Sequence, residues 1–423
     1  MESVIICVAM ALQPSCIAFF IQNLKKMKSK NFRLPGIANR LAGAVSVIGL
    51  GLLLVGCGKE KVSSTAQSAA PAEQIVTVFT FDEYTDPALL TEFKARTGVS
   101  VELKFYEETD EMVENLKSNP GEYDVFLCED GYIPILAGKR MIKTLDHSRL
   151  SNWKNLDQRR LDQPFDPGNE FSVPYLWGTT LLAYRKDMIK DPVHSWKLIF
   201  DPALKDKVSF MNERMECYAG VLRSMGLNLP GADQAAITQA ADAMVNLINE
   251  HGLRMGGEKE VKQNLIDGSS ALSMMFSGDA VRLAAENPEI PIGYFIPGEG
   301  ATVWTDSFCI SRDTTRLENA YKFLDFMLEA KSAAASSNFA HYASPNKAAA
   351  AFVSEDLLAN PTIYPSDEVL AKCSFFQLKN IDSQREVNKG WRRVQEAWEA
   401  RSGQASDAVR DPLEPTSDLT APN

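Results

Sequence analysis

The fold is decided by residues 75–128, which read IVTVFTFDEYTDPALLTEFKARTGVSVELKFYEETDEMVENLKSNPGEYDVFLC. Three runs within this stretch are rich in β-branched and aromatic residues and predict strands: 75–81, 99–106 and 123–128. Helical segments separate them. Asp86 and Pro87 supply an N-cap with proline at the first helical position, and Gly98 ends the first helix. Strands that alternate with helices of this length predict an α/β fold with a largely parallel sheet.

Acids beside an aromatic residue follow three of the predicted strands. The first strand ends in the loop 81–84 (Phe-Asp-Glu-Tyr) and the third in 129–132 (Glu-Asp-Gly-Tyr). A later strand, predicted over 271–276, ends in 276–279 (Phe-Ser-Gly-Asp). Ligands of parallel α/β sheets bind at the carboxyl ends of the strands. We therefore expect these loops to lie at a binding site.

Trp304 and Asp306 lie two residues apart in an otherwise apolar run that ends at Ile310. Residues at i and i+2 of a strand share a face, so one surface would carry both a π cloud and a negative charge. Both features attract an organic cation. Taken alone, the pair is better explained as a core tryptophan beside a surface aspartate, because such pairs are common. Only partners elsewhere in the chain can favour a binding site.

A long extended segment occupies residues 171–184, which read FSVPYLWGTTLLAY. Pro174 stands inside it and Gly178 stands in its middle. Both residues are unusual in the interior of a central strand. They suit a strand that leaves one sheet and enters another.

Glu213 and Glu216 share a face at the predicted start of a helix. Acids in a first turn are favoured by the helix dipole in any protein, so this local explanation is the stronger one. Paired carboxylates could also act as acid and base, as in glycoside hydrolysis. The sequence has none of the common motifs for a nucleophile elbow, a zinc-binding helix, a phosphate loop or a redox Cys-x-x-Cys pair, so an enzyme has little support.

The body of the chain is acidic. The 423 residues suffice for two or three domains, and 45% hydrophobic with 23% charged residues is ordinary for a globular protein. After residue 56 the chain carries 38 basic and 54 acidic residues, a net charge of −16. This charge argues against nucleic acid and anionic membranes as partners and suits a cationic one.

The amino-terminal segment predicts a secretory signal. Basic residues from Lys28 to Arg40 precede an apolar run over 41–55, which ends in Leu-Val-Gly before Cys57. This ending resembles the lipobox of bacterial lipoproteins, in which the cysteine is lipidated, and the apolar run is short for a membrane anchor. A further apolar stretch, 1–20, precedes this signal, and we favour Met27 as the real start.

Four cysteines lie beyond Cys57: Cys128, Cys217, Cys309 and Cys373. They are far apart and lack the spacing of metal ligands. A disulfide is feasible in an exported protein. Three of the four stand in apolar surroundings, however, and we expect them to be buried as small hydrophobic residues.

Taken in order, six segments closely resemble the polyamine-binding proteins of bacterial ABC transporters, the spermidine- and putrescine-binding family. The segments are 81–84, 172–178, 213–216, 276–279, 304–306 and 342–346. The resemblance covers roughly residues 75–400. No single motif is specific, and the agreement of all of them in sequence carries the assignment.

The resemblance implies a two-lobed type II periplasmic binding protein fold with a ligand cleft between the lobes. Combined with the predicted signal, the resemblance divides the chain into five parts. Residues 1–56 would be a signal peptide and residues 57–74 a lipid-anchored flexible linker. Lobe 1 would comprise 75–178 plus about 306–345, lobe 2 would comprise 179–305 plus about 346–400, and 401–423 would be a disordered tail.

The resemblance also implies roles for single residues. Aromatic walls for the methylene chain would be Phe81, Phe276 and Trp304; the first two stand where the family usually has tryptophan. Carboxylates for the ammonium groups would be Glu83, Glu216, Asp279 and Asp306, with Tyr84 and Tyr342 as hydroxyl partners. Glu213 resembles the spermidine binders, whereas Asp279 and Lys379 resemble the putrescine binders. Glu129 and Asp130 stand where the family usually carries serine and a small or hydroxyl residue. The candidate ligand-binding residues are therefore Phe81, Glu83, Tyr84, Glu129, Asp130, Glu213, Glu216, Phe276, Asp279, Trp304, Asp306, Tyr342 and Lys379.

The implied function is that of a solute-binding lipoprotein anchored through Cys57 in the periplasm or cell envelope. It would capture putrescine or spermidine and deliver it to an ABC permease. We expect a monomer that has no catalytic residues, no cofactor, no metal and no nucleic-acid partner. One alternative is a binder or sensor of another organic cation on the same fold, and a less favoured one is a hydrolase that uses carboxylates.

Overall fold

The computed structural model describes residues 74–107, 109–376, 378 and 380–403. Five of the expectations above lie outside these residues: the signal peptide, the lipidation of Cys57, the linker up to residue 73, the tail beyond residue 403 and the role of Lys379. Of the helices that the structure describes, none is long and apolar enough to cross a membrane.

Residues 74–128 form the alternating unit that the sequence predicts. Its elements are β1 (Gln74–Thr80), α3 (Pro87–Thr97), β2 (Val99–Phe105), α4 (Thr109–Ser118) and β3 (Val125–Cys128). The side chain of Asp86 accepts a hydrogen bond from the amide of Ala88, and Gly98 ends α3 in the left-handed region at φ 72°. Both helix signals are thereby confirmed. β1 pairs in parallel with β2 and with β3.

The sheet is parallel at its two ends and antiparallel in its middle. The remaining strands are β4 (Ser172–Arg185), β5 (Val208–Met211), β6 (Arg254–Gly256), β7 (Leu272–Phe276), β8 (Ile292–Phe295) and β9 (Val303–Ile310). The strand order is β2-β1-β3-β9-β4-β7-β5-β6, with β8 paired to β4. β5 pairs in parallel with β6 and β7, whereas β9 and β4 run antiparallel to all their neighbours. The prediction of a largely parallel sheet is therefore wrong for the middle strands.

β4 joins the two ends of the sheet, as its proline and glycine predict. Its first half, 172–179, pairs with β9, and its second half pairs with β7 and β8. The register between β4 and β9 shifts between Pro174 and Leu176, because proline cannot donate to the ladder and a bulge accommodates it. Gly178 lies directly opposite Trp304.

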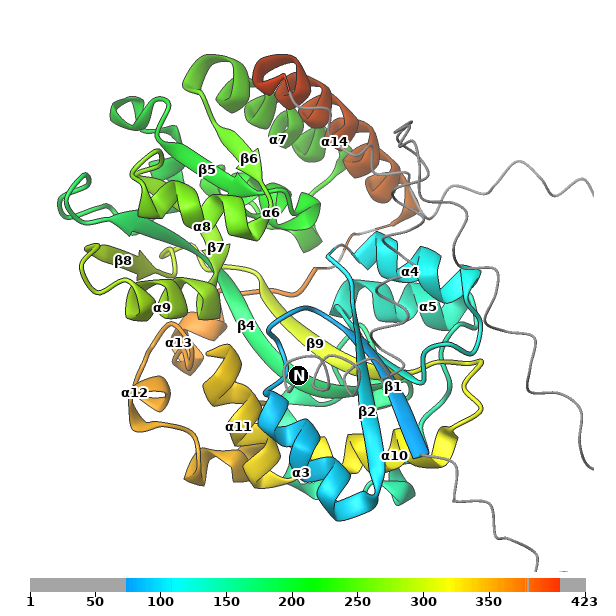
Figure 1. Cartoon of the computed structure of the whole chain (residues 1–423). Helices are drawn as coiled ribbons and strands as arrows, with labels where there is room; N and C mark the ends of the chain where they lie inside the picture. The colour runs from blue at the N-terminus through cyan, green and yellow to red at the C-terminus, as the bar shows by residue number, and fades with distance from the viewer. Residues whose placement is uncertain (1–73, 108, 377, 379, 404–423) are drawn as a thin grey trace, which may run out of the picture. The chain divides into compact units, whose positions relative to one another are not determined.

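Helices cover the two ends separately. The longer ones are α5 (Ile133–Gly138), α6 (Arg214–Ser224), α7 (Gln234–Asn246), α8 (Glu258–Ile266), α9 (Ser277–Glu286), α10 (Leu317–Met327), α11 (Ala330–Ala340) and α14 (Ile381–Ser402); two single turns are α12 (Glu355–Leu358) and α13 (Asp367–Leu370). One end of the sheet carries α3, α4, α5 and α10, and the other carries α6 to α9 and α14 (Figure 1). We call the part built on β1–β3 lobe 1 and the part built on β5–β8 lobe 2.

Each lobe has its own hydrophobic core. In lobe 1, Phe93 of α3 packs with Phe308 of β9 and Phe323 of α10. In lobe 2, Phe210 of β5 and Trp391 of α14 belong to one buried cluster with residues of α6 and α7. The α/β fold is therefore two-lobed, as expected. The residue limits given above for the two lobes stay a prediction.

The four cysteines in the described residues are free thiols. Cys128, Cys217 and Cys309 are buried, and Cys373 is partly exposed. The expectation that three of them pack as small hydrophobic residues is confirmed.

Replacing Gly178 with alanine tests the close approach of β4 to Trp304. A Cβ atom at this position would lie 2.5 Å from Cζ2 of Trp304 and 3.0 Å from Oγ of Ser277. We expect Gly178→Ala to lower the free energy of unfolding in urea by about 1–3 kcal/mol, because overpacking forces the indole from its place. The matched control is Gly138→Ala, where no heavy atom lies within 4 Å of the new methyl group. Equal stability of Gly178→Ala and the unmodified protein would contradict this packing.

Candidate functional site

Most candidate residues meet where the middle strands pass between the lobes. Trp304 and Asp306 stand on β9, Phe276 and Asp279 stand where β7 enters α9, and Glu216 lies in the first turn of α6. The loop after β1 brings Phe81 and Tyr84, and Tyr342 follows α11. Strand ends from both lobes thus contribute to one site.

Five aromatic rings form a continuous chain from lobe 2 to lobe 1. Phe276 and Tyr342 contact Trp304 edge to face, with ring centroids 5.4 Å and 4.9 Å from its ring. Tyr342 lies 5.8 Å from Tyr84, which lies 5.7 Å from Phe81. Trp304 is only 8% exposed, and its buried Nε1 has no hydrogen-bond acceptor among the described residues. Such a donor calls for an explanation.

Asp306 is a buried carboxyl group whose identified partner is a hydroxyl. Asp306 is 7% exposed, and the hydroxyl of Tyr84 donates a hydrogen bond to its Oδ2 at 2.7 Å. Within the described residues, no ion pair reaches it. Burial raises the pKa of Asp306 to about 8; the Tyr84 bond offsets part of this rise, and the charges of Glu129 and Glu258 add to it. With a pKa of about 8, Asp306 is mainly protonated at neutral pH.

Glu216 is a second buried acid that forms no ion pair in the described part of the chain, although the charge of Arg223 lowers its pKa. It is 3% exposed, and its Oε2 has no hydrogen-bond partner there. Burial raises the pKa of Glu216 to about 7, although the hydroxyls of Thr180 and Thr302 lower it. The helix dipole explains an acid in this turn, but it does not explain why the carboxyl is buried. Glu213, the N-cap residue of α6, is only partly buried.

Asp279, in contrast, already has a full set of partners. The hydroxyl of Tyr342 donates to its Oδ2 at 2.7 Å, and the ammonium group of Lys262 donates to its Oδ1 at 2.6 Å. The guanidinium of Arg282 lies 3.6 Å from the same Oδ1 and 3.6 Å from Glu83. Sequence reasoning missed both cations. Arg282 follows Asp279 at i+3, a spacing that predicts contact, but nothing near Lys262 predicts its partner 17 residues away.

The remaining acidic candidates make other contacts. Asp130 accepts a hydrogen bond from the amide of Thr305 at 3.0 Å, so its buried carboxylate ties the turn after β3 to β9. Glu129 accepts a hydrogen bond from Thr109. Burial raises the pKa of both acids. Glu83 has a side chain that is 69% exposed, and Arg282 links it to Asp279.

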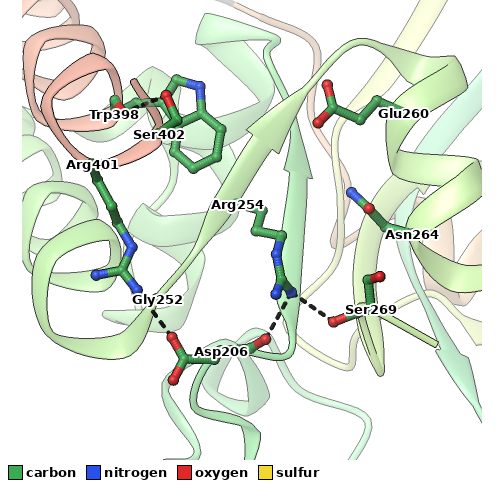
Figure 2. A pocket seen from close by; sticks show the side chains of 9 residues that line it. All are labelled: Asp206, Gly252, Arg254, Glu260, Asn264, Ser269, Trp398, Arg401 and Ser402. Carbon is green, nitrogen blue, oxygen red and sulfur yellow. Dashed lines mark hydrogen bonds and ion pairs between the residues drawn. The ribbon is translucent and has the colours of Figure 1, made fainter. Parts of the chain in front are cut away.

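A polar hollow on lobe 2 is a separate feature. It has a volume of about 290 Å³ and lies between β6, α8 and the end of α14. Figure 2 shows that Arg254 and Arg401 both point toward Asp206. Arg254 donates to backbone oxygens of Asp206 and Ser269 at 2.7 Å and 2.6 Å, and Arg401 donates to the Asp206 carboxylate at 3.0 Å. These internal pairs fasten α14 to lobe 2.

In the part of the chain that the structure describes, no group of three or more histidine, cysteine, aspartate or glutamate side chains could hold a metal ion. Tyrosine hydroxyls donate to Asp306 and Asp279, and cationic side chains lie at Asp279. Desolvated carboxyls beside aromatic faces are suited to an organic cation.

Comparison with known proteins agrees with this geometry. Residues 88–365 match the family model described as bacterial extracellular solute-binding protein. The chain is 30% identical over 308 residues to the spermidine/putrescine-binding periplasmic protein of Escherichia coli, covering 72% of this chain and 87% of that protein. It is 28% identical over 350 residues to the putrescine-binding periplasmic protein SpuD of Pseudomonas aeruginosa, covering 79% and 94%.

A solved structure has the same fold. The spermidine/putrescine ABC transporter substrate-binding protein PotD from Streptococcus pneumoniae superposes with a TM-score of 0.69 at 23% identity, covering 77% of this chain and 99% of that one. The likeness supports the two-lobed substrate-binding fold described above.

The raised pKa of Asp306 makes the stability of the ligand-free protein depend on pH. An unfolded aspartate titrates near its ordinary value of 3.8, whereas folded Asp306 titrates at about 8. Between these values the folded state binds a proton that the unfolded state has lost, so stability falls as pH rises from about 4 to about 8. We expect Asp306→Asn to flatten this fall and to be the more stable protein at pH 8, because an amide carries no charge.

Urea unfolding at pH 5 and pH 8 would measure the effect. Glu396→Gln, at an exposed carboxylate on α14, is the control and should keep the slope of the unmodified protein. An Asp306→Asn variant with that same slope would show that Asp306 does not titrate as described.

Proposed function

The chain belongs to the family of bacterial extracellular solute-binding proteins, and on that premise we propose that it captures a polyamine, putrescine or spermidine, and delivers it to an ABC permease. The observation that carries the proposal is the buried acid Asp306, which is bonded to Tyr84 of the aromatic chain, together with a second buried acid, Glu216, next to Thr180 of β4 and to Thr302. Neither acid forms an ion pair among the described residues, although the charge of Arg223 acts on Glu216. A ligand ammonium group would supply a cationic partner.

The physical demands of a polyamine fit this site. Such a molecule is a flexible chain of methylene groups between ammonium groups, so it needs apolar walls for the stem and carboxylates for the charges. Each aromatic–cation contact contributes about 0.5–2 kcal/mol, and each charge-assisted hydrogen bond about 1.5–3 kcal/mol. Several must act together to offset the desolvation of the ammonium groups. Trp304, Phe276 and Tyr84 offer the faces, and Asp306 and Glu216 offer the charges.

Contacts between the lobes suggest how the bound state is signalled. Tyr342 packs in the core of lobe 1 and donates to Asp279 of lobe 2, and Arg282 of lobe 2 lies near Glu83 of lobe 1. Closing the lobes around a ligand excludes water and strengthens the charged contacts. The closed form is what a permease can distinguish from the empty one.

Location and partners follow from the family and from the amino-terminal sequence. The relatives are named as periplasmic proteins, and we place this chain outside the cytoplasm as well. We propose that lipid on Cys57 anchors it to a membrane and that it acts as a monomer. A transport role without catalysis, cofactor or nucleic acid is consistent with the family.

Two other functions deserve a direct comparison. A sensor would bind the same cation and pass the signal to a membrane partner instead of a permease. A hydrolase could use the protonated Asp306 as an acid, since its pKa is raised to about 8. Turnover of a substrate would favour the hydrolase, but membership in a solute-binding family makes it the weaker candidate.

Calorimetric titration with putrescine, spermidine and spermine tests the proposal. We expect at least one of them to bind, and we expect Asp306→Asn to weaken that binding by about tenfold or more, because the variant removes one charged partner from a buried pair. Glu396→Gln should bind as the unmodified protein does. The absence of heat with all three amines defeats the proposal, and unchanged affinity in Asp306→Asn removes Asp306 from the site.

A further inference from the structure

The candidate site has two ends, one at Asp306 and Glu216 and the other at Asp279, and they differ in how far their carboxyl groups are paired with cations. Asp306 and Glu216 are buried carboxyls with no ion pair among the described residues, although the charge of Arg223 acts on Glu216. At Asp279, the chain supplies its own cations, Lys262 at 2.6 Å and Arg282 at 3.6 Å. One end therefore calls for an ammonium group from outside, and the other already contains one.

Lys262 is held at Asp279 by its surroundings. Its side chain is 17% exposed and projects from α8, a helix that contacts β5 and β7. A second carboxylate, Glu258, lies 3.5 Å from its ammonium group, one helical turn earlier. Burial lowers the pKa of Lys262, but Asp279 and Glu258 outweigh burial and the net shift is upward. Lys262 is therefore charged at neutral pH.

The oxygens of Asp279 leave little room for another donor. Lys262 and Arg282 approach Oδ1, and the hydroxyl of Tyr342 donates to Oδ2 at 2.7 Å. A ligand ammonium group brought to this carboxylate would stand beside the like charge of Lys262 and would be repelled. The ligand end at Asp279 should therefore be uncharged.

The indole of Trp304 contacts Tyr342, whose hydroxyl donates to Asp279, so the orphaned donor of Trp304 belongs to a ring beside that end of the site. Its Nε1 is buried and has no acceptor in the described part of the chain. An ammonium group offers only donors, so a fully charged polyamine cannot satisfy an indole N–H. A carbonyl oxygen can. The site thus combines two acids that form no ion pair, Asp306 and Glu216, with the indole N–H of Trp304, which has no acceptor among the described residues.

We propose that Lys262 takes the place of one ligand ammonium group, so that the site selects polyamines whose end at Asp279 is capped by an acyl group. This inference rests on the proposed function, because it assumes that the ligand is an amine bound between Asp279 and Asp306. It deepens that function by naming a residue that determines specificity. The selected class is a mono-N-acylated polyamine.

The test compares putrescine with N-acetylputrescine by calorimetric titration. We expect the unmodified protein to bind N-acetylputrescine more tightly, by about tenfold or more, because it avoids the repulsion by Lys262. Lys262→Met removes the charge but keeps a long apolar side chain, and it should reverse the preference in favour of putrescine. Lys262→Arg keeps the charge and should keep the preference of the unmodified protein.

Lys259→Met is the matched control, since Lys259 is an exposed lysine on the same helix; its preference should equal that of the unmodified protein. Equal affinity of the unmodified protein for both ligands overturns this inference, and so does an unchanged affinity ratio in Lys262→Met. If putrescine or spermidine still binds, the proposed function stands. Absence of binding of any amine to any variant overturns both. The affinity ratio of N-acetylputrescine to putrescine is measured on the unmodified protein alone. The inference therefore stays falsifiable even if Lys262→Met does not fold.

Discussion

The burial of Asp306 without a compensating cation is the constraint on which the arrangement depends. Removing a carboxylate from water is costly unless it is paired, and the protein meets this cost by holding the group protonated with one tyrosine hydroxyl as a partner. Asp306 lies on β9, which runs through the middle of the sheet and pairs with both β3 and β4. The acid therefore cannot move to solvent without disrupting the strands that join the lobes.

The aromatic chain and the crossing strands follow from the same geometry. Gly178 of β4 leaves space for the indole of Trp304 on the neighbouring strand, and the indole in turn contacts Phe276 and Tyr342. The indole of Trp304 and the carboxyl of Asp306 are thus fixed by strand register. A site held in this way needs little rearrangement of its own residues to bind a ligand, which lowers the entropic cost of binding.

Local signals made much of the fold predictable from sequence. Asp86, Pro87 and Gly98 delimit α3 as expected, and Pro174 with Gly178 indicates that β4 passes from one end of the sheet to the other. The antiparallel direction of β9 was not predictable, because strand direction in the sheet depends on long connections that carry no local pattern.

The residue types of the candidate site could be proposed from the sequence, but their charge balance could not. The resemblance to a known family sufficed to propose Trp304, Asp306 and Asp279 as parts of one site. It could not show that Lys262 of α8 reaches Asp279 of α9, since that contact depends on how two helices pack beside β7. Nor could it show that Glu216 is buried, because an acid in a first helical turn has the same pattern at the surface.

The central claim is that a ligand ammonium group replaces the proton on a buried acid. The most direct measurement is the heat of polyamine binding at pH 7 in two buffers of different ionisation enthalpy. If Asp306 has a pKa of about 8 in the empty site and is ionised in the complex, binding releases about one proton, and the heat changes with the buffer accordingly. Binding with the same heat in both buffers would contradict the account, because the acids would then be ionised before the ligand arrives.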